Sequence, residues 1–355
     1  MNLDNIREKI DYIDHEILRL LNERFEQSIR TKRHKEMIQD AERETLVLEN
    51  LKNYADAFNL LQEGFVTKLY SSIISESRKI QKEKRILIGF QGEHGAFSEA
   101  AAKHCRPQAI TLPYPDFSDV FREVEQDRVD MGIVPVENSL GGAITEVNEL
   151  LVNTDLKIVG GIKLRISHSL LKLPETHFRD IRVVYSHPQA IAQCRSFLNR
   201  QRLESRPFYD TAGAARMLRK DKPKAGAVIA NHLCADLYNL EIVKENIQDH
   251  KENHTRFLFL SREEQKAESN KCSIIFSTPH KAGALFGVLE TFAEERINLT
   301  RIESLACRDY PENSVFFLDF HTDTANPKIG KILDILKDKT IFLKYLGCYK
   351  EEEVG

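Results

Sequence analysis

The chain of 355 residues lacks the features that mark secreted, membrane-bound or nucleic-acid-binding proteins. No apolar run approaches the length of a membrane span. The N-terminus is charged from Asp4 onward, which predicts that there is no signal peptide. The 51 basic and 54 acidic residues nearly balance, so the composition gives no sign of nucleic acid or a membrane as a partner.

The six cysteines do not have the spacing of a disulfide-rich or metal-binding protein. No C-x-x-C pair occurs, and the cysteines are scattered at positions 105, 194, 234, 272, 307 and 348. This pattern predicts reduced core thiols in a cytoplasmic protein, with neither disulfides nor metal ligands.

Neither proline nor glycine occurs before Gly64, which predicts an all-helical first segment. Apolar residues follow one another there at alternating spacings of four and three, the pattern of a heptad seam; they are Ile6, Ile10, Ile13, Ile17 and Leu20. We expect three helices, over residues 3–37, 42–58 and 63–82. One long exposed seam on so small a bundle predicts an intertwined dimer.

Polar residues interrupt these apolar patterns. Arg24 takes the next heptad position of the seam, and Lys35, eleven residues on, shares its face. Ser77 and Gln81 continue the four-residue apolar steps of the third helix. Buried cations and amides need partners, so their convergence predicts a pocket for a small anion. The alternative is that Arg24 and Lys35 reach solvent or pair with nearby acidic residues.

These residues stand within motifs of a known family. The stretches Ile-Arg7-Glu-Lys-Ile, Asn-Glu-Arg24, Asp40-Ala-Glu-Arg43-Glu44 and Ile-Ser-Glu-Ser77 resemble the all-helical chorismate mutases. The resemblance implies substrate-binding residues at Arg7, Arg24, Lys35, Asp40, Arg43, Glu44, Ser77 and Gln81. Among these, Lys35, Gln81 and Glu44 would act on the rearranging atoms, and Arg7 would enter the partner subunit's pocket. Lys35→Ala is expected to abolish mutase turnover and leave the fold intact.

The segment from 85 to 263 alternates short apolar strands with helices, and it is internally repeated at a constant offset of 94 residues. Residues 92–97 align with 186–191, 116–119 with 210–213, and 131–137 with 225–231, without a gap. Two such units predict a two-lobed α/β fold with a cleft between the lobes. The alternative is chance similarity between two βαβ units.

Polar residues at the predicted strand ends should line this cleft, because ligands bind at such ends in open α/β sheets. We expect Glu137, Asn138, Ser139, Ser186, Gln189, Thr211, Thr255 and Arg256 to bind the substrate. Thr255 and Arg256 alternate along one strand, so one of them should face the cleft and the other should face away.

The same segment resembles the prephenate dehydratases and the related arogenate dehydratases. The resemblance is carried by Val-Pro-Val-Glu137-Asn-Ser, Ser186-His-Pro-Gln189-Ala, Asp210-Thr-Ala-Gly-Ala-Ala and Thr255-Arg-Phe. It implies that Thr255 is essential for dehydration, so Thr255→Ala should remove that activity and spare the mutase. The first motif departs from the family over residues 89–98. The residues leave the proton donor open between Glu137, His187 and His254.

The last segment predicts a β-α-β-β-α-β order, with strands at 272–277, 299–306, 314–320 and 340–349 and helices at 283–295 and 327–337. This is a ferredoxin-like α+β fold. The segment resembles the ACT regulatory domain, although Leu305-Ala306 replaces the family's Arg-Pro. The resemblance implies phenylalanine as an effector bound by Gly283, Ala284, Leu285, Glu303 and Ser304. The alternative is a purely structural dimerisation domain.

Together these resemblances imply a multidomain enzyme of phenylalanine biosynthesis. We expect a mutase at 1–84, a dehydratase with a periplasmic-binding-protein-like fold at 85–263, and a regulatory domain at 268–355. The substrates would be chorismate and prephenate, with no cofactor or metal, because neither reaction exchanges electrons. A homodimer or higher homo-oligomer is expected. Two alternatives stay open: a preference of the second site for arogenate, and a cleft that only senses a ligand.

Overall fold

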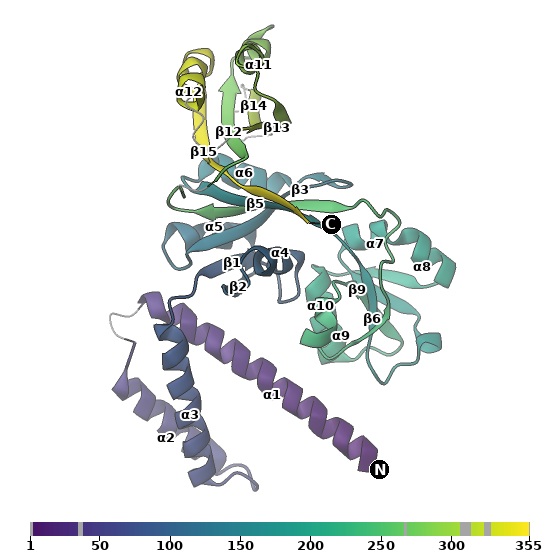
Figure 1. Cartoon of the computed structure of the whole chain (residues 1–355). Coiled ribbons are helices and arrows are strands. Elements are labelled where there is room, and N and C mark those ends of the chain that lie inside the picture. The colour runs from purple at the N-terminus through teal and green to yellow at the C-terminus, as the bar shows by residue number, and fades with distance from the viewer. Residues whose placement is uncertain (1–2, 35–37, 266–267, 306–313, 323–327, 355) are drawn as a thin grey trace. The chain divides into compact units, whose positions relative to one another are not determined.

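The computed structural model describes residues 3–34, 38–265, 268–305, 314–322 and 328–354 (Figure 1). The chain divides into two compact units, Met1–Arg85 and Ile86–Gly355. Within the described ranges, no helix is both long enough and apolar enough to cross a membrane.

The first unit is made of helices, as the absence of proline and glycine predicts. The elements are α1 (Leu3–Thr31), the 3-10 helix η1 (Lys32–His34), α2 (Ala41–Ala55) and α3 (Glu63–Lys82). Helix α3 packs against both α1 and α2. The predicted first helix is shorter than expected, because it tightens into η1 after Thr31.

The heptad seam of α1 is not covered within this unit. Ile6, Ile10, Ile13, Ile17 and Leu20 are each between 42% and 54% exposed. A row of half-exposed aliphatic side chains over four turns of one helix is unusual for a helix that packs only within its own chain.

The second unit begins with two lobes, each built on its own sheet. The first sheet has the order β16-β5-β11-β3-β1-β2, with β4 paired to β3, and the second has the order β10-β6-β9-β7-β8. The first-lobe strands are β1 (Leu87–Gln91), β2 (Ile110–Tyr114), β3 (Met131–Asn138), β4 (Gly142–Ala143), β5 (Lys157–Arg165), β11 (His254–Ser261) and β16 (Glu351–Val354). The second-lobe strands are β6 (Ser169–Lys172), β7 (Val183–Ser186), β8 (Glu204–Pro207), β9 (Gly226–Ala230) and β10 (Glu241–Lys244).

The two lobes repeat one topology, as the constant offset predicts. Strand β1 pairs in parallel with β2 and β3, and β7 pairs in parallel with β8 and β9. An antiparallel strand then follows in each lobe, β11 beside β3 and β6 beside β9. The chain enters the second lobe between β5 and β6 and returns between β10 and β11, so both lobes border one cleft.

Short helices follow the parallel strands in both lobes. They are α4 (Phe97–Cys105), α5 (Phe117–Glu125) and α6 (Thr145–Asn153) in the first lobe, and α7 (Pro188–Gln193), α8 (Arg195–Gln201), η2 (Phe178–Asp180), α9 (Thr211–Asp221) and α10 (Leu233–Leu237) in the second. Asp116 and Asp210, which occupy equivalent positions of the repeat, are the N-cap residues of α5 and α9. The lobe cores are apolar; Phe90, Ile133 and Leu170 are fully buried.

The C-terminal part has the predicted β-α-β-β-α-β order. Its sheet has the order β13-β14-β12-β15. The elements are β12 (Lys271–Thr278), α11 (Ala284–Glu294), β13 (Leu299–Leu305), β14 (Ser314–His321), α12 (Lys328–Lys339) and β15 (Phe342–Tyr349). One strand was not anticipated: β16 leaves this sheet and pairs in parallel with β5 of the first lobe.

The expectation that no cysteine forms a disulfide is wrong for one pair. Cys272 and Cys348 are joined in a disulfide between β12 and β15. They occupy facing positions of the antiparallel pair, with Cα atoms 4.1 Å apart. Because 76 positions separate them in sequence, only the sheet register brings the two thiols together. Cys105, Cys194 and Cys234 are free, and Cys307 lies outside the described residues.

Candidate active sites

The helical unit contains a cavity of about 310 Å³ between its three helices. Six of the eight residues predicted to bind a small anion line this cavity: Arg24, Asp40, Arg43, Glu44, Ser77 and Gln81. The cavity does not test the other two residues, Arg7 and Lys35. Lys35 lies outside the described residues. Arg7 lies near the exposed start of α1, 3.7 Å from Asp4.

Hydrogen bonds fix several of these side chains at the cavity wall. Arg24 donates to the Ser77 hydroxyl at 2.8 Å, which joins α1 to α3. Gln81 donates to the Ser28 hydroxyl at 2.8 Å, and both Ser77 and Gln81 are buried. The arrangement holds a cation and an amide donor on one inner face, as an anion with an ether or hydroxyl oxygen requires.

Sequence reasoning missed one charged group of this cavity. Arg78 also lines it, and its Nε lies 3.6 Å from Glu44. The sequence marks Arg78 only weakly, because it belongs to a run of charged residues that is typical of a solvated helix end.

The two lobes of the second unit enclose a larger cavity of about 360 Å³. Of the eight predicted substrate-binding residues, four line it: Asn138, Gln189, Thr211 and Thr255. Residues of both lobes form its walls. The Gln189 amide of the second lobe lies against Gly141 of the first, because a Cβ atom at Gly141 would lie 2.2 Å from Gln189 Nε2. The predicted cleft is therefore present.

Asn138 and Thr255 face each other across neighbouring strands. They are register partners of β3 and β11, and Asn138 Nδ2 donates to Thr255 Oγ1 at 2.9 Å. The orientation of the amide is fixed from its other side, because the backbone N–H groups of Leu140 and Gly141 donate to Oδ1. The Thr255 hydroxyl is thereby an acceptor toward Asn138 through one of its two lone pairs, and its own hydrogen can be donated to another group.

A chain of buried polar groups continues from Asn138. Its Nδ2 also donates to Asn253 Oδ1 at 2.8 Å, and Asn253 Nδ2 donates to Gln193 Oε1 at 3.0 Å. The Gln193 oxygen also lies 2.9 Å from His168 Nε2. Burial lowers the pKa of His168, so this imidazole is neutral and acts as a donor. Gln193 and His168 were missed; Gln193 lies one helical turn after Gln189, whereas nothing in the sequence marks His168.

Glu137 and Arg256 are the first correction to the predicted site. As neighbours of Asn138 and Thr255 they point to the other face of the sheet, because side chains alternate along a strand. That one of Thr255 and Arg256 faces the cleft and the other faces away is confirmed. Neither Glu137 nor Arg256 lines the cavity.

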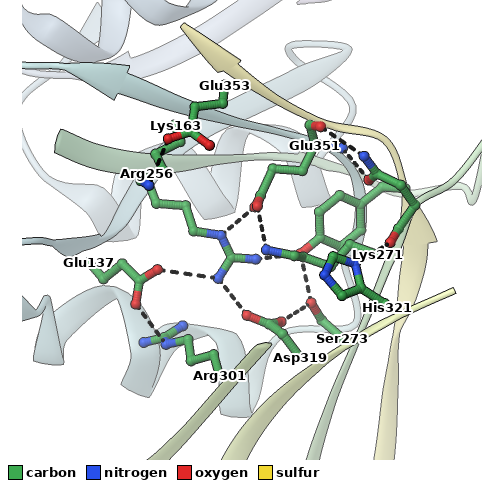
Figure 2. A network of polar contacts seen from close by, with 12 residues as sticks. Glu137, Lys163, Arg256, Lys271, Ser273, Arg301, Asp319, His321, Glu351 and Glu353 are labelled. Carbon is green, nitrogen blue, oxygen red and sulfur yellow. Dashed lines mark hydrogen bonds and ion pairs between the residues drawn. The ribbon is translucent and has the colours of Figure 1, made fainter. Parts of the chain in front are cut away.

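Arg256 instead lies in a buried network shared with the C-terminal sheet (Figure 2). Its guanidinium donates to Asp319 of β14 and Glu351 of β16, and to the Tyr349 hydroxyl at 2.7 Å. Glu137 reaches Arg301 of β13, with its carboxylate 3.1 Å from Nε. Burial lowers the pKa of Arg256, but Tyr349, Asp319 and Glu351 raise it well above its ordinary value.

Two predicted serines are also placed outside the cavity. The fully buried Ser186 donates to the Ile229 carbonyl at 2.6 Å and thus belongs to the core of the second lobe. The Ser139 hydroxyl lies on the surface between the Glu252 carbonyl and the His254 N–H. Both serines bond to backbone groups and are withdrawn as substrate-binding residues.

The predicted regulatory residues fall into two groups. Gly283 is the N-cap of α11, with φ of 85°, as a glycine at a helix start predicts. Glu303 and Ser304 line a cavity of about 140 Å³ against α6 of the first lobe. Gly283, Ala284 and Leu285 are not among the residues that line it.

Comparison with known proteins identifies the family of both parts of the chain. Residues 6–82 match the family model "Chorismate mutase type II", and residues 88–265 match "Prephenate dehydratase". A bifunctional chorismate mutase/prephenate dehydratase of Aquifex aeolicus is 37% identical over 98% of this chain and 97% of its own length. The chain belongs to the bifunctional chorismate mutase/prephenate dehydratase family.

Two further proteins extend the comparison. An arogenate dehydratase/prephenate dehydratase of Arabidopsis thaliana is 37% identical over 79% of this chain and 76% of its own length. The solved structure of a prephenate dehydratase from Arthrobacter aurescens, described in complex with L-Phe, is 27% identical, covers 75% of this chain and 90% of that chain, and has a TM-score of 0.67.

The chain is therefore a two-reaction enzyme of phenylalanine biosynthesis. It rearranges chorismate to prephenate and then converts prephenate to phenylpyruvate by loss of carbon dioxide and water. The product of the first reaction is the substrate of the second.

The Arg256 network makes a testable contribution to stability. In Asp319→Asn the buried guanidinium loses a charged partner, which should lower the free energy of unfolding of the second unit by about 3 kcal/mol. Urea denaturation followed by circular dichroism measures this. The matched control is Glu353→Gln, which removes an exposed ion pair with Lys163 and should change little. Equal losses in the two variants would contradict the importance of the buried network.

Proposed function

We propose that the mutase reaction takes place in the helical cavity, with Arg24 and Arg43 binding the two substrate carboxylates. The rearrangement transfers no proton and uses no nucleophile, so the residues only fold the substrate and stabilise charge on the breaking ether bond. Gln81 and Lys35 donate to the ether oxygen, and Glu44 holds the ring hydroxyl. The bond from Arg24 to Ser77 supports this assignment, because it holds the guanidinium at the cavity wall and leaves other N–H groups for a carboxylate.

We propose that dehydration takes place in the cleft, with Thr255 donating a hydrogen bond to the substrate. Asn138 orients the Thr255 hydroxyl, and Gln189 and Thr211 bind polar groups of prephenate. The single observation that supports this most is the bond from the Asn138 amide to Thr255 Oγ1, which makes the hydroxyl an acceptor toward Asn138 and leaves its hydrogen for a ligand in the cavity. Two of the three proton donors considered, Glu137 and His254, do not line the cavity.

Single substitutions should remove one of the two activities and leave the other. Lys35→Ala should abolish conversion of chorismate while prephenate is still consumed, and Thr255→Ala should do the reverse. The expected loss is about a hundredfold or more in each case, since each variant removes a donor to reacting atoms. Supplying pure chorismate to the wild type and identifying phenylpyruvate tests both activities together.

The control for the threonine is Thr255→Ser, which keeps the hydroxyl and should keep most of the dehydratase rate. A Thr255→Ala enzyme with near-normal dehydration would remove Thr255 from the mechanism. A Lys35→Ala enzyme with full mutase activity would do the same for Lys35.

We further propose a homodimer in which the exposed seam of α1 packs against a second copy and Arg7 enters the partner's mutase pocket. The support is the row of half-exposed aliphatic residues on the helix that also carries Arg7 and Arg24. An isologous interface buries the same seam on both subunits.

Mixing two inactive variants tests the shared pocket. Arg7→Ala and Arg24→Ala should each lose mutase activity as homodimers. When they are denatured together and refolded, each mixed dimer contains one pocket with both arginines intact. About a quarter of the wild-type rate should therefore return under random pairing of equal amounts. No recovery, with mixed dimers shown by mass spectrometry of tagged subunits, would place both arginines in one subunit's pocket.

We also propose that phenylalanine binds the C-terminal domain, an ACT-like module, and inhibits dehydration. The support is the βαββαβ order, the glycine at the start of α11, and the L-Phe complex of the similar Arthrobacter aurescens protein.

The rate of prephenate consumption with added phenylalanine tests this regulation. The wild-type rate should fall, and the Gly283→Val rate should fall less at the same phenylalanine concentration. A β-branched side chain is incompatible with a φ of 85°, so this variant should distort the start of α11 where phenylalanine is proposed to bind. Tyrosine at equal concentration is the control ligand. A wild-type rate that is the same with and without phenylalanine would favour a purely structural domain.

A further inference from the structure

Loss of the ring hydroxyl from prephenate needs a proton, because hydroxide is a poor leaving group at neutral pH. The cleft cavity has four titratable lining residues in the described part of the chain: His168, His187, Tyr209 and Asp210. Burial lowers the pKa of both histidines, which leaves them unprotonated at neutral pH. Tyr209 already donates its hydroxyl hydrogen to Glu93.

Asp210 differs from these three in how its two oxygens are used. Its Oδ1 accepts the Gly213 N–H and caps α9. Its Oδ2 is buried and has no hydrogen-bond partner among the residues that the structure describes. That oxygen faces the turn after β1 of the other lobe, because a Cβ atom at Gly92 would lie 3.5 Å from it. A buried carboxyl oxygen without a partner is costly unless a ligand supplies one.

We propose that Asp210 is the general acid of the dehydratase, an inference that rests on the proposed dehydration site in the cleft. The Asp210 carboxyl protonates the ring hydroxyl as the carbon–oxygen bond breaks. The electron pair of the breaking bond to the ring carboxylate moves into the ring, which becomes aromatic. Carbon dioxide and water leave, and the Asp210 carboxylate takes a proton from solvent to complete the cycle.

The surroundings of Asp210 favour its acid form. The net pKa of Asp210 is raised to about 6. Burial is the largest cause and Glu93, which is itself paired with Arg216, adds to it, whereas the Gly213 and Ala212 N–H groups lower the pKa. A bound dianionic substrate acts in the same direction as Glu93. The other titratable groups that act on Asp210 or are acted on by it are Tyr209, Cys234 and Tyr238, whose pKa values are all raised, first of all by burial. At neutral pH a minor fraction of Asp210 therefore carries the proton, and the charge of a bound substrate increases that fraction.

A structural role as a helix cap is the competing explanation, and the internal repeat provides a control for the loss of a carboxylate. Asp116 occupies the equivalent position, 94 residues earlier, at the start of α5. It is exposed and is not among the residues that line the cleft cavity. The Asp116 side chain makes no capping bond to α5, whereas the Asp210 side chain accepts the Gly213 N–H. Asparagine caps helices as well as aspartate does, so Asp210→Asn keeps the cap and removes only the acid. Asp116→Asn removes a carboxylate at the equivalent position away from the cleft.

The test compares the full-length wild type with Asp210→Asn and Asp116→Asn. For Asp210→Asn, kcat of dehydration should fall about a hundredfold or more, with little change in KM, in mutase rate or in Tm. Asp116→Asn should match the wild type in all four. The wild-type kcat for prephenate, corrected for uncatalysed conversion, should decline as pH rises above about 6. The residual rate of Asp210→Asn should lack that decline.

Two outcomes would overturn the assignment. One is an Asp210→Asn enzyme within a few-fold of the wild type, with the same pH profile. The other is a loss in Asp210→Ala that Asp210→Asn restores, which would show a capping role only. Measuring Thr255→Ala alongside distinguishes failure of the cleft proposal from failure of the Asp210 assignment. Normal dehydration in Thr255→Ala would remove the threonine from the mechanism. Loss of dehydratase activity in Thr255→Ala but not in Asp210→Asn would reject the role of Asp210 alone.

Discussion

The buried guanidinium of Arg256 is the constraint on which the dehydratase half depends. A charge so deeply buried is tolerated only when it is paired and hydrogen-bonded, and its partners come from β14, β15 and β16 of the C-terminal part. The strand that carries Arg256 cannot shift by one residue, because that would bury the threonine face against these carboxylates. The same contacts that hold the C-terminal sheet therefore fix the register that turns Thr255 and Asn138 toward the cleft.

The two candidate sites are built on different frameworks. The first cavity lies between helices, where four-residue spacing places Ser77 and Gln81 on one inner face of α3. The cleft lies between two sheets of the same topology, and its walls come from strand ends and helix starts of both lobes. Equivalent positions of the two lobes differ in their surroundings, since Asp116 is exposed whereas Asp210 lines the cavity.

Much of this was predictable from the sequence where the geometry is local. Ser77 and Gln81 followed from helical spacing, and the doubled lobe followed from an ungapped offset. Which side chains of β11 face the cleft was not predictable, because side chains on both faces are buried. Thr255 lines the cleft, and Arg256 contacts the C-terminal sheet. A strand buried on both sides carries no polar signal for either face. The bonds of Ser186 and His168, and the pairing of Cys272 with Cys348, depend on tertiary contacts that no local pattern records.

Strand β16 has a mechanical consequence. The C-terminal sheet is tied to the first lobe at two places, by the connection from β11 to β12 and by β16 beside β5. Two attachments restrict rigid-body motion of the C-terminal sheet to rotation about the line through them. Because β16 also covers the outer edge of β5, any such rotation acts directly on the sheet that carries Thr255.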